Sequence, residues 1–138
     1  LHRVDRRQRQ MCIRDREKAD EDSKIGDAFT IAEFVMGVNE TTEADLPETV
    51  LAWDLVRAVN MARWAFICGY INEDEMWEAI RTTAGIAKES FNSWEEYGNS
   101  FAVGRGIWRG ETDDYETADE VVGALLNKED SPWKAIEW

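Results

Sequence analysis

Histidine, cysteine and proline are scarce in this sequence of 138 residues, which holds one His, two Cys and two Pro. No run of apolar residues approaches the ~20 that a membrane-spanning helix needs, so we expect no membrane partner. Basic side chains are also in deficit, with 16 against 29 acidic ones and a formal net charge of −13. This charge repels the phosphates of nucleic acids and anionic lipids, so no nucleic-acid partner is expected.

The first 16 residues differ from the rest because they are basic and have no apolar period. They contain Arg3, Arg6, Arg7, Arg9, Arg14 and Arg16. One codon choice for MCIRD, ATG TGT ATA AGA GAC, resembles the transposon end that attaches sequencing adapters to fragmented DNA. We therefore interpret residues 1–16 as a translated adapter, a non-native or disordered segment, and set them aside. The alternative is a basic nucleic-acid-binding arm or a transit peptide, and the underlying nucleotide read decides between the two.

Setting that segment aside removes His2 and Cys12 and leaves Cys68 as the one cysteine. Because the segment holds six Arg and two Asp, residues 17–138 carry a net charge of −17. Without histidine, a Ser-His-Asp or Cys-His catalytic device cannot be assembled, and zinc-ligand spacings are absent. We therefore expect no catalytic residue, no metal and no cofactor. A single cysteine allows no internal disulfide, which fits a reducing cytoplasm.

Apolar residues recur at helical spacing through residues 17–138, and no sustained alternation predicts a strand. We expect one all-α domain, an orthogonal or irregular bundle of five or six helices. Helices are expected over 25–36, 48–69, 72–91, 93–110 and 117–126, with a final turn from 131 and an acidic loop, ETDDYE, before residue 117. The boundaries rest on capping and stop residues, namely Asn72, Ser93, Thr117, Ser131, Gly69 and Gly110.

The segment over residues 48–70 is apolar on two sides. Leu51, Leu55, Val59, Ala62 and Phe66 lie along one side of a helical wheel, and Trp53, Val56, Trp64 and Ile67 along the other. A helix with two apolar sides is typical of the middle of a bundle, so we expect the other helices to surround it. The segment over 93–110 has little bulk at Gly98, Ala102, Gly104 and Gly106, which would let another helix approach closely.

Three stretches resemble one known family. AWDLVRAVNMARWAFICGYINEDEMWEAI, SWEEYGNSFAVGRGIW and the closing DSPWKAIEW are similar to the bacterial family known as domain of unknown function 1266. The resemblance covers about residues 48–138. It implies a small cytoplasmic bacterial domain with no established activity, so it adds identity and little mechanism. The segment over residues 17–40 is interpreted as an N-terminal helical extension of the same domain.

One cluster of side chains is a candidate ligand-binding site. At 100° per residue, Trp53, Arg57, Asn60 and Trp64 fall within about 60° of one another, so two polar groups lie between two indoles. Asp54 and Arg63 border this side, and the segment over 93–110 offers Arg105 beside Trp108. The candidate site is therefore Trp53, Asp54, Arg57, Asn60, Arg63, Trp64, Arg105 and Trp108.

Two interpretations of this cluster stay open. In the first, Asp54 pairs with Arg57 or Arg105 in a buried ion pair that fixes helix register. In the second, arginine outnumbers its acidic partner, and a small anionic ligand with a carboxylate or phosphate group fills the gap between the guanidinium planes.

For function, we expect a non-catalytic binding or interaction module. One alternative is an immunity-type protein whose carboxylates neutralise a basic toxin, which a neighbouring toxin gene would support. A second alternative is an enzyme that uses Asp54, Arg57 and Arg105, which requires a concave pocket lined by these three residues.

Overall fold

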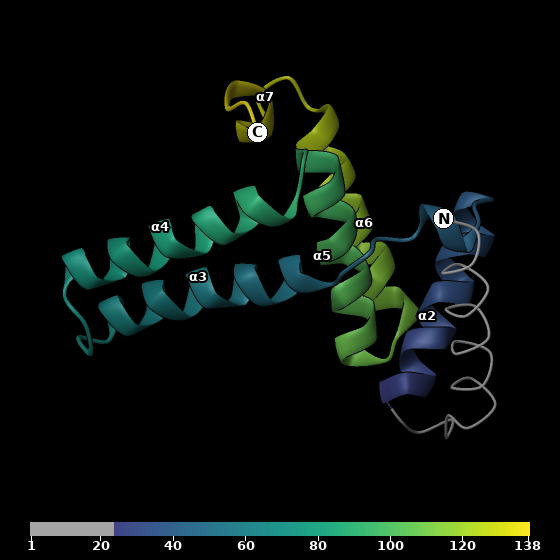
Figure 1. Ribbon diagram of the computed structural model, residues 1–138, viewed down its shortest axis with the longest axis horizontal. Helices are drawn as coiled ribbons and strands as arrows, with labels where there is room; N and C mark the ends of the chain where they lie inside the picture. Colours follow the sequence, from purple (N-terminus) through teal and green to yellow (C-terminus); the bar gives the residue numbers. More distant parts are fainter. Residues whose placement is uncertain (1–23) are drawn as a thin grey trace.

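A computed structural model describes residues 24–138 of the chain, and the adapter interpretation of residues 1–16 lies outside them. The described part forms six α-helices and contains no strand (Figure 1). The helices are α2 (Lys24–Asn39), α3 (Leu51–Ile67), α4 (Glu73–Ser90), α5 (Trp94–Arg109), α6 (Thr112–Asn127) and α7 (Pro132–Ala135), with a short 3₁₀ helix, η1 (Glu43–Asp45), between α2 and α3. The all-α bundle predicted from the sequence is confirmed.

Several helix ends follow local sequence signals. The Asn72 side chain accepts from the Glu75 N–H at 3.0 Å, and the Glu75 carboxylate accepts from the Asn72 N–H at 2.8 Å, which closes the predicted capping box of α4. The Ser93 hydroxyl caps α5 in the predicted way by accepting from the Glu96 N–H. Gly110 ends α5 with a φ of 74°, a left-handed conformation that costs glycine little.

Two helix starts differ from the prediction. The sequence ETDDYE is the beginning of α6 rather than a loop, and the Thr117 hydroxyl donates to the Asp113 carbonyl one turn back instead of capping. Helix α3 begins at Leu51, later than expected, and its first N–H groups donate to side chains outside the helix. The buried Ser100 hydroxyl of α5 accepts from the Ala52 N–H at 3.2 Å and donates to the Thr49 carbonyl at 2.7 Å.

The central helix is α5, so the prediction that residues 48–70 lie at the centre is wrong. Helix α5 packs against α2, α3 and α6 (Figure 1). Close approach is possible because α5 lacks bulk at the contact points, as predicted. A Cβ at Gly98 would lie 2.5 Å from Val122, and one at Gly106 would lie 2.9 Å from the Tyr115 Cβ.

Helices α3 and α4 form an antiparallel hairpin that extends away from the other helices (Figure 1). At its base, Ala52 and Leu55 of α3 pack against Ala87 and Phe91. Towards its tip the apolar side chains become exposed: Trp64 is 63% and Ile67 75% exposed. The second apolar side of α3 is therefore covered only near the base of the hairpin.

The main core lies where α2, α5 and α6 meet. Ile31 and Val35 of α2 are buried there with Ala102 and Val103 of α5 and Tyr115 of α6. Within residues 24–138, none of the helices is both long enough and apolar enough to traverse a bilayer.

Gly104 provides a test of the α3–α5 contact. A Cβ at this position would lie 2.6 Å from the Trp53 Cβ and 3.2 Å from the Val50 Cβ. We expect Gly104→Ala to lower the free energy of unfolding by about 1–3 kcal/mol, because the helix backbones would have to separate. The control is Gly85→Ala in α4, where a Cβ would meet nothing within 4 Å. It should raise stability by up to ~1 kcal/mol through helix propensity. Urea denaturation measures both, and equal effects at the two positions would contradict the packing account.

Candidate functional site

Trp53 lies at the crossing of α3 and α5 and is the centre of the candidate site. Its ring is 5.4 Å from the ring of Phe101 and 6.3 Å from that of Trp108, measured between centroids. Its indole N–H is buried and has no hydrogen-bond acceptor among the described residues. Contact among these large rings makes this crossing an apolar base for the charged groups around it.

Arg57 lies between two indoles, as predicted, but the second indole is Trp108 and not Trp64. The guanidinium carbon of Arg57 is 5.2 Å from the Trp108 ring centre and 5.7 Å from that of Trp53. Its ion pair with Asp54 is long at 3.8 Å, and the two side chains are 44% and 67% exposed. An exposed pair of this kind contributes little to stability. Arg57 is therefore held mainly by contact with the two rings.

Arg105 is bound internally, and its partner is Asp114 of α6. The Arg105 Nε donates to Asp114 Oδ1 at 2.7 Å, and an Nη atom lies 2.6 Å from the same oxygen. Arg109 shares the carboxylate, with its Nε 3.4 Å from Oδ2. The guanidinium of Arg105 also lies over Trp53 at 5.3 Å. No contact joins Asp54 to Arg105 in the described part of the chain, so the predicted pair of these two residues is not formed.

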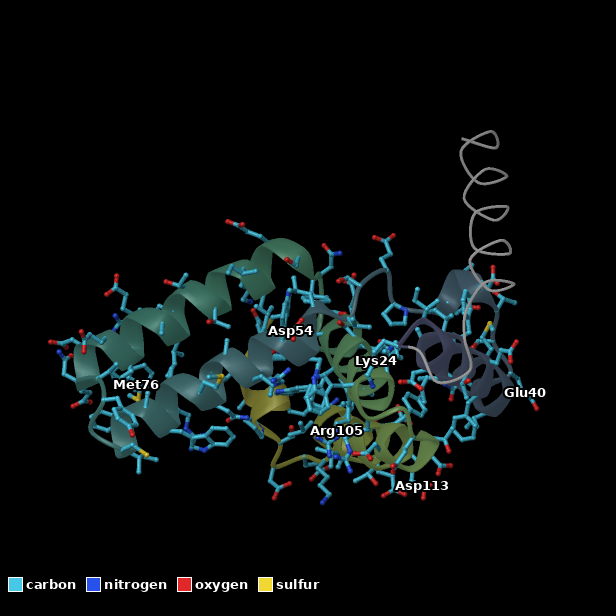
Figure 2. All side chains as sticks on the ribbon, turned by 90° about the horizontal axis from the view of Figure 1, so that it is seen from below. Lys24, Glu40, Asp54, Met76, Arg105 and Asp113 are labelled. Carbon is cyan, nitrogen blue, oxygen red and sulfur yellow. The ribbon has the colours of Figure 1, made fainter. Side chains whose placement is uncertain are left out.

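The remaining predicted residues are not brought into this cluster. Asn60, Arg63 and Trp64 lie further along α3, towards the tip of the hairpin, where α5 no longer covers the helix. Arg63 and Trp64 are exposed, and Asn60 is half-buried. Figure 2 shows the geometry: Asp54 and Arg105 lie near the crossing, whereas Met76 marks the far end of the hairpin. The predicted site is thus divided into a packed half and an uncovered half.

A cavity of about 390 Å³ adjoins the packed half, between α3, α5 and α6. Its lining includes Trp53, Phe101, Arg105, Asp113, Asp114 and Val121. Neither Asp54 nor Arg57 lines it, so this cavity is not the pocket that the enzyme alternative requires. Because two carboxylates face one guanidinium that is already paired, the cavity does not favour an anion. Within residues 24–138, no group of three or more His, Cys, Asp or Glu side chains could hold a metal ion.

Sequence reasoning missed Asp114 and Arg109. Both lie beside the Gly110 stop, where α5 ends and α6 begins after a single turn. A signal was present, because an aspartate is favoured in the first turn of a helix and two of them follow Gly110 closely. In a loop, these aspartates would have no fixed position beside Arg105 and Arg109, whereas the first turn of α6 gives Asp114 one.

The shared carboxylate gives a prediction that separates the two candidate partners. We expect Asp114→Asn to lower the free energy of unfolding by about 1–2 kcal/mol, because two guanidinium groups lose a charged acceptor that is only 16% exposed. Asp54→Asn should change it by less than about 0.5 kcal/mol, since that pair is exposed. Chemical denaturation of both variants is the measurement. A larger loss of unfolding free energy from Asp54→Asn than from Asp114→Asn would contradict this assignment and favour Asp54 as the main acidic partner.

Comparison with known proteins adds a family. Neither the search of curated proteins nor the search of solved structures gave a match. A family profile described as "Protein of unknown function (DUF1266)" matches residues 2–138. The match extends beyond the 48–138 resemblance: it includes the 17–40 segment and also residues 2–16, for which the nucleotide read stays the test of the adapter interpretation. Because the profile spans nearly the whole sequence, the chain belongs to the DUF1266 family.

Proposed function

We propose that this protein is a non-catalytic interaction module, and that it binds an acidic helix of a protein partner along one side of α3. One observation carries the proposal: apolar side chains continue to the C-terminal end of α3 on the side that faces away from α4, but α5 covers only its first turns. We call the uncovered part the outer face of α3. It consists of Arg57, Asn60, Met61, Trp64 and Ile67, which lie within about 60° of Trp64 at 100° per residue.

The outer face is hydrophobic where it is exposed. Met61, Trp64 and Ile67 are 61%, 63% and 75% exposed. They lie opposite Leu55, which is buried against α4. Contiguous apolar surface of this kind marks interaction sites more often than single exposed residues do. Tryptophan is also the side chain most enriched among residues that dominate binding energy.

The charges beside this face favour a partner with carboxylates. Helix α3 carries Asp54, Arg57 and Arg63 as its charged residues, so it is basic in a strongly acidic chain. The one ion pair of Arg57 with a described residue is the long one to Asp54, and no ion pair joins Arg63 to any described residue. The acidic first turn of α4 lies on the other helix of the hairpin. A partner that approaches α3 from the side away from α4 therefore meets guanidinium groups first.

A helix of the partner is the element that best matches the outer face of α3, because that face is itself a stripe along a helix. An amphipathic helix can place apolar side chains against Trp64 at i, i+3 and i+4 spacing while glutamates on its flanks reach the arginines. A second copy of this chain, paired through the same face, would bring Arg57 and Arg63 towards their own counterparts and is less favourable. The immunity-type alternative, in which carboxylate-rich loops neutralise a basic toxin, stays a prediction that neighbouring genes would test.

The test is a display library of helical peptides with a fixed apolar face and flanking positions that vary between Glu and Lys. We expect selection on the protein to enrich glutamate. Trp64→Ala should weaken the selected peptides about tenfold or more, as loss of a central tryptophan does. The matched control is Trp77→Ala on α4, which removes a tryptophan that is 43% exposed outside the outer face. It should leave affinity within about twofold, a change of less than 0.5 kcal/mol.

Charge reversal provides the second arm of this test. Arg57→Glu with Arg63→Glu should shift the enrichment from glutamate to lysine, because the electrostatic preference of the face is inverted. An unchanged preference, or equal losses from Trp64→Ala and Trp77→Ala, would contradict the proposal. Sedimentation of the unmodified chain gives an independent outcome, since a dimer abolished by Trp64→Ala would identify a second copy as the occupant.

A further inference from the structure

A second cavity, of about 340 Å³, lies between α2, η1, the segment before α3, α5 and α6. Its apolar lining is Val35, Pro47 and Val103. Its polar lining is Asn39, Thr41, Asp45, Asn99, Tyr115 and Asp119. Val35, Val103 and Tyr115 are buried, whereas Asn39, Asp45 and Asn99 are exposed. The cavity thus has an apolar interior and a polar rim.

The local electrostatics of this cavity are negative. Two carboxylates line it, Asp45 and Asp119, and no Lys, Arg or His does. Asn39 is the last residue of α2, so the cavity also lies at a helix C-terminus, where the aligned peptide dipoles attract cations. The left-handed Glu40, with a φ of 52°, turns the chain back so that Thr41 and Asp45 form a wall.

Tyr115 and Asp119 of this cavity have hydrogen-bonding capacity that no described residue satisfies. The Tyr115 hydroxyl accepts from Asn39 Nδ2 at 3.2 Å, and no described residue accepts its proton. Asp119 makes no hydrogen bond or ion pair within residues 24–138. Burial, and then the charge of Glu120, raise the pKa of the Asp119 carboxyl above its ordinary value. A positively charged ligand would relieve both unfavourable effects on this carboxylate.

Asp45, the carboxylate at the rim of the cavity, is hydrogen-bonded within residues 24–138, unlike Asp119. Asp45 Oδ2 accepts from both the N–H and the hydroxyl of Thr42, each at 2.9 Å. These hydrogen bonds lower the pKa of Asp45. The group is therefore ionised at neutral pH and keeps Oδ1 for another donor. The cavity then offers one fixed negative charge at its mouth and one acceptor deeper inside.

We infer that this cavity binds a small primary ammonium compound, with the ammonium group between Asp45 and Asp119 and an alkyl stem on Val35 and Val103. An ammonium carries three donors, which matches two carboxylates and an amide or hydroxyl oxygen. A bare metal ion fits less well, because calcium takes six to eight oxygens at about 2.3–2.6 Å. No cluster of metal-ligating side chains exists among the described residues. The volume also suits a ligand with several carbon atoms.

The experiment titrates the full chain with n-butylammonium chloride, followed by calorimetry and by two-dimensional amide NMR. We expect saturable binding, with the largest shifts at Thr41, Tyr115 and Asp119. The neutral analogue n-butanol should not saturate. Asp119→Asn should weaken n-butylammonium about tenfold or more, because a charge-assisted hydrogen bond is lost. Asp113→Asn is the matched control, since it makes the same change on the same helix outside this cavity.

Three outcomes would overturn this site. They are no saturable binding of n-butylammonium, equal loss in Asp119→Asn and Asp113→Asn, or complete displacement by an equal concentration of potassium chloride. Folding does not confound the comparison, because replacing a half-buried charge by a neutral isostere removes a desolvation cost, and urea denaturation verifies this for each variant. The site is independent of the outer face of α3, so failure of one leaves the other standing.

Discussion

The close contacts of α5 are the constraint on which the rest of the structure depends. Three of its glycines leave room for side chains of neighbouring segments, because a Cβ there would be too close to them. The neighbours are Val122 and Trp133 at Gly98, Trp53 and Val50 at Gly104, and Tyr115 and Ile31 at Gly106. One helix therefore receives neighbours on several sides at near-backbone distance. The cost in helix propensity, up to ~1 kcal/mol for each glycine, is offset by the apolar surface buried at each contact. Ser100, fully buried on the same helix, adds a polar fixing point by satisfying both ends of the turn that starts α3.

The direction of the hairpin follows from that anchoring. Because α3 is held to α5 only through its first turns, its remaining length extends beyond the bundle with α4 alongside (Figure 1). The base of α4 is fastened by the C-terminal aromatic residues: the Trp138 indole donates to the Phe91 carbonyl at 2.8 Å, and Lys88 lies 4.8 Å above the Trp138 ring. Trp94 stacks on Trp133 at 4.8 Å in the same group. A hairpin fixed at its base and free along one side is suited to present a surface.

Features encoded within a few residues could be predicted from the sequence, and features that join distant segments could not. The Asn72 capping box, the Gly69 and Gly110 stops and the small residues of α5 depend on local chemistry and are confirmed. At the start of α3, the Thr49 hydroxyl accepts from the Leu51 N–H, and Ser100, 48 residues away, accepts from the Ala52 N–H. The contact with Ser100 joins distant segments, and the predicted start of this helix was wrong. The start of α6 was misplaced because Thr117 followed by Glu120 resembles a cap, although the first aspartates already fit a helix. Of the candidate site, the position of Arg57 beside the Trp53 ring was predicted, whereas its contact with Trp108 joins two helices and was not. The acidic partner Asp114 was missed because its segment was expected to be a loop.

The error over α3 has a physical meaning that extends to its function. The helical spacing of apolar residues in α3 indicates which side chains gain stability from burial. It does not indicate whether another helix of this chain or another molecule buries them. On the side of Leu55 the cover is α4, and around Trp53 it is α5, so both belong to this chain. Around Trp64 the same apolar stripe continues and no described helix covers it. The apolar stripe of α3 is therefore covered only in part by the described helices. The acidic partner that we propose would cover the remainder.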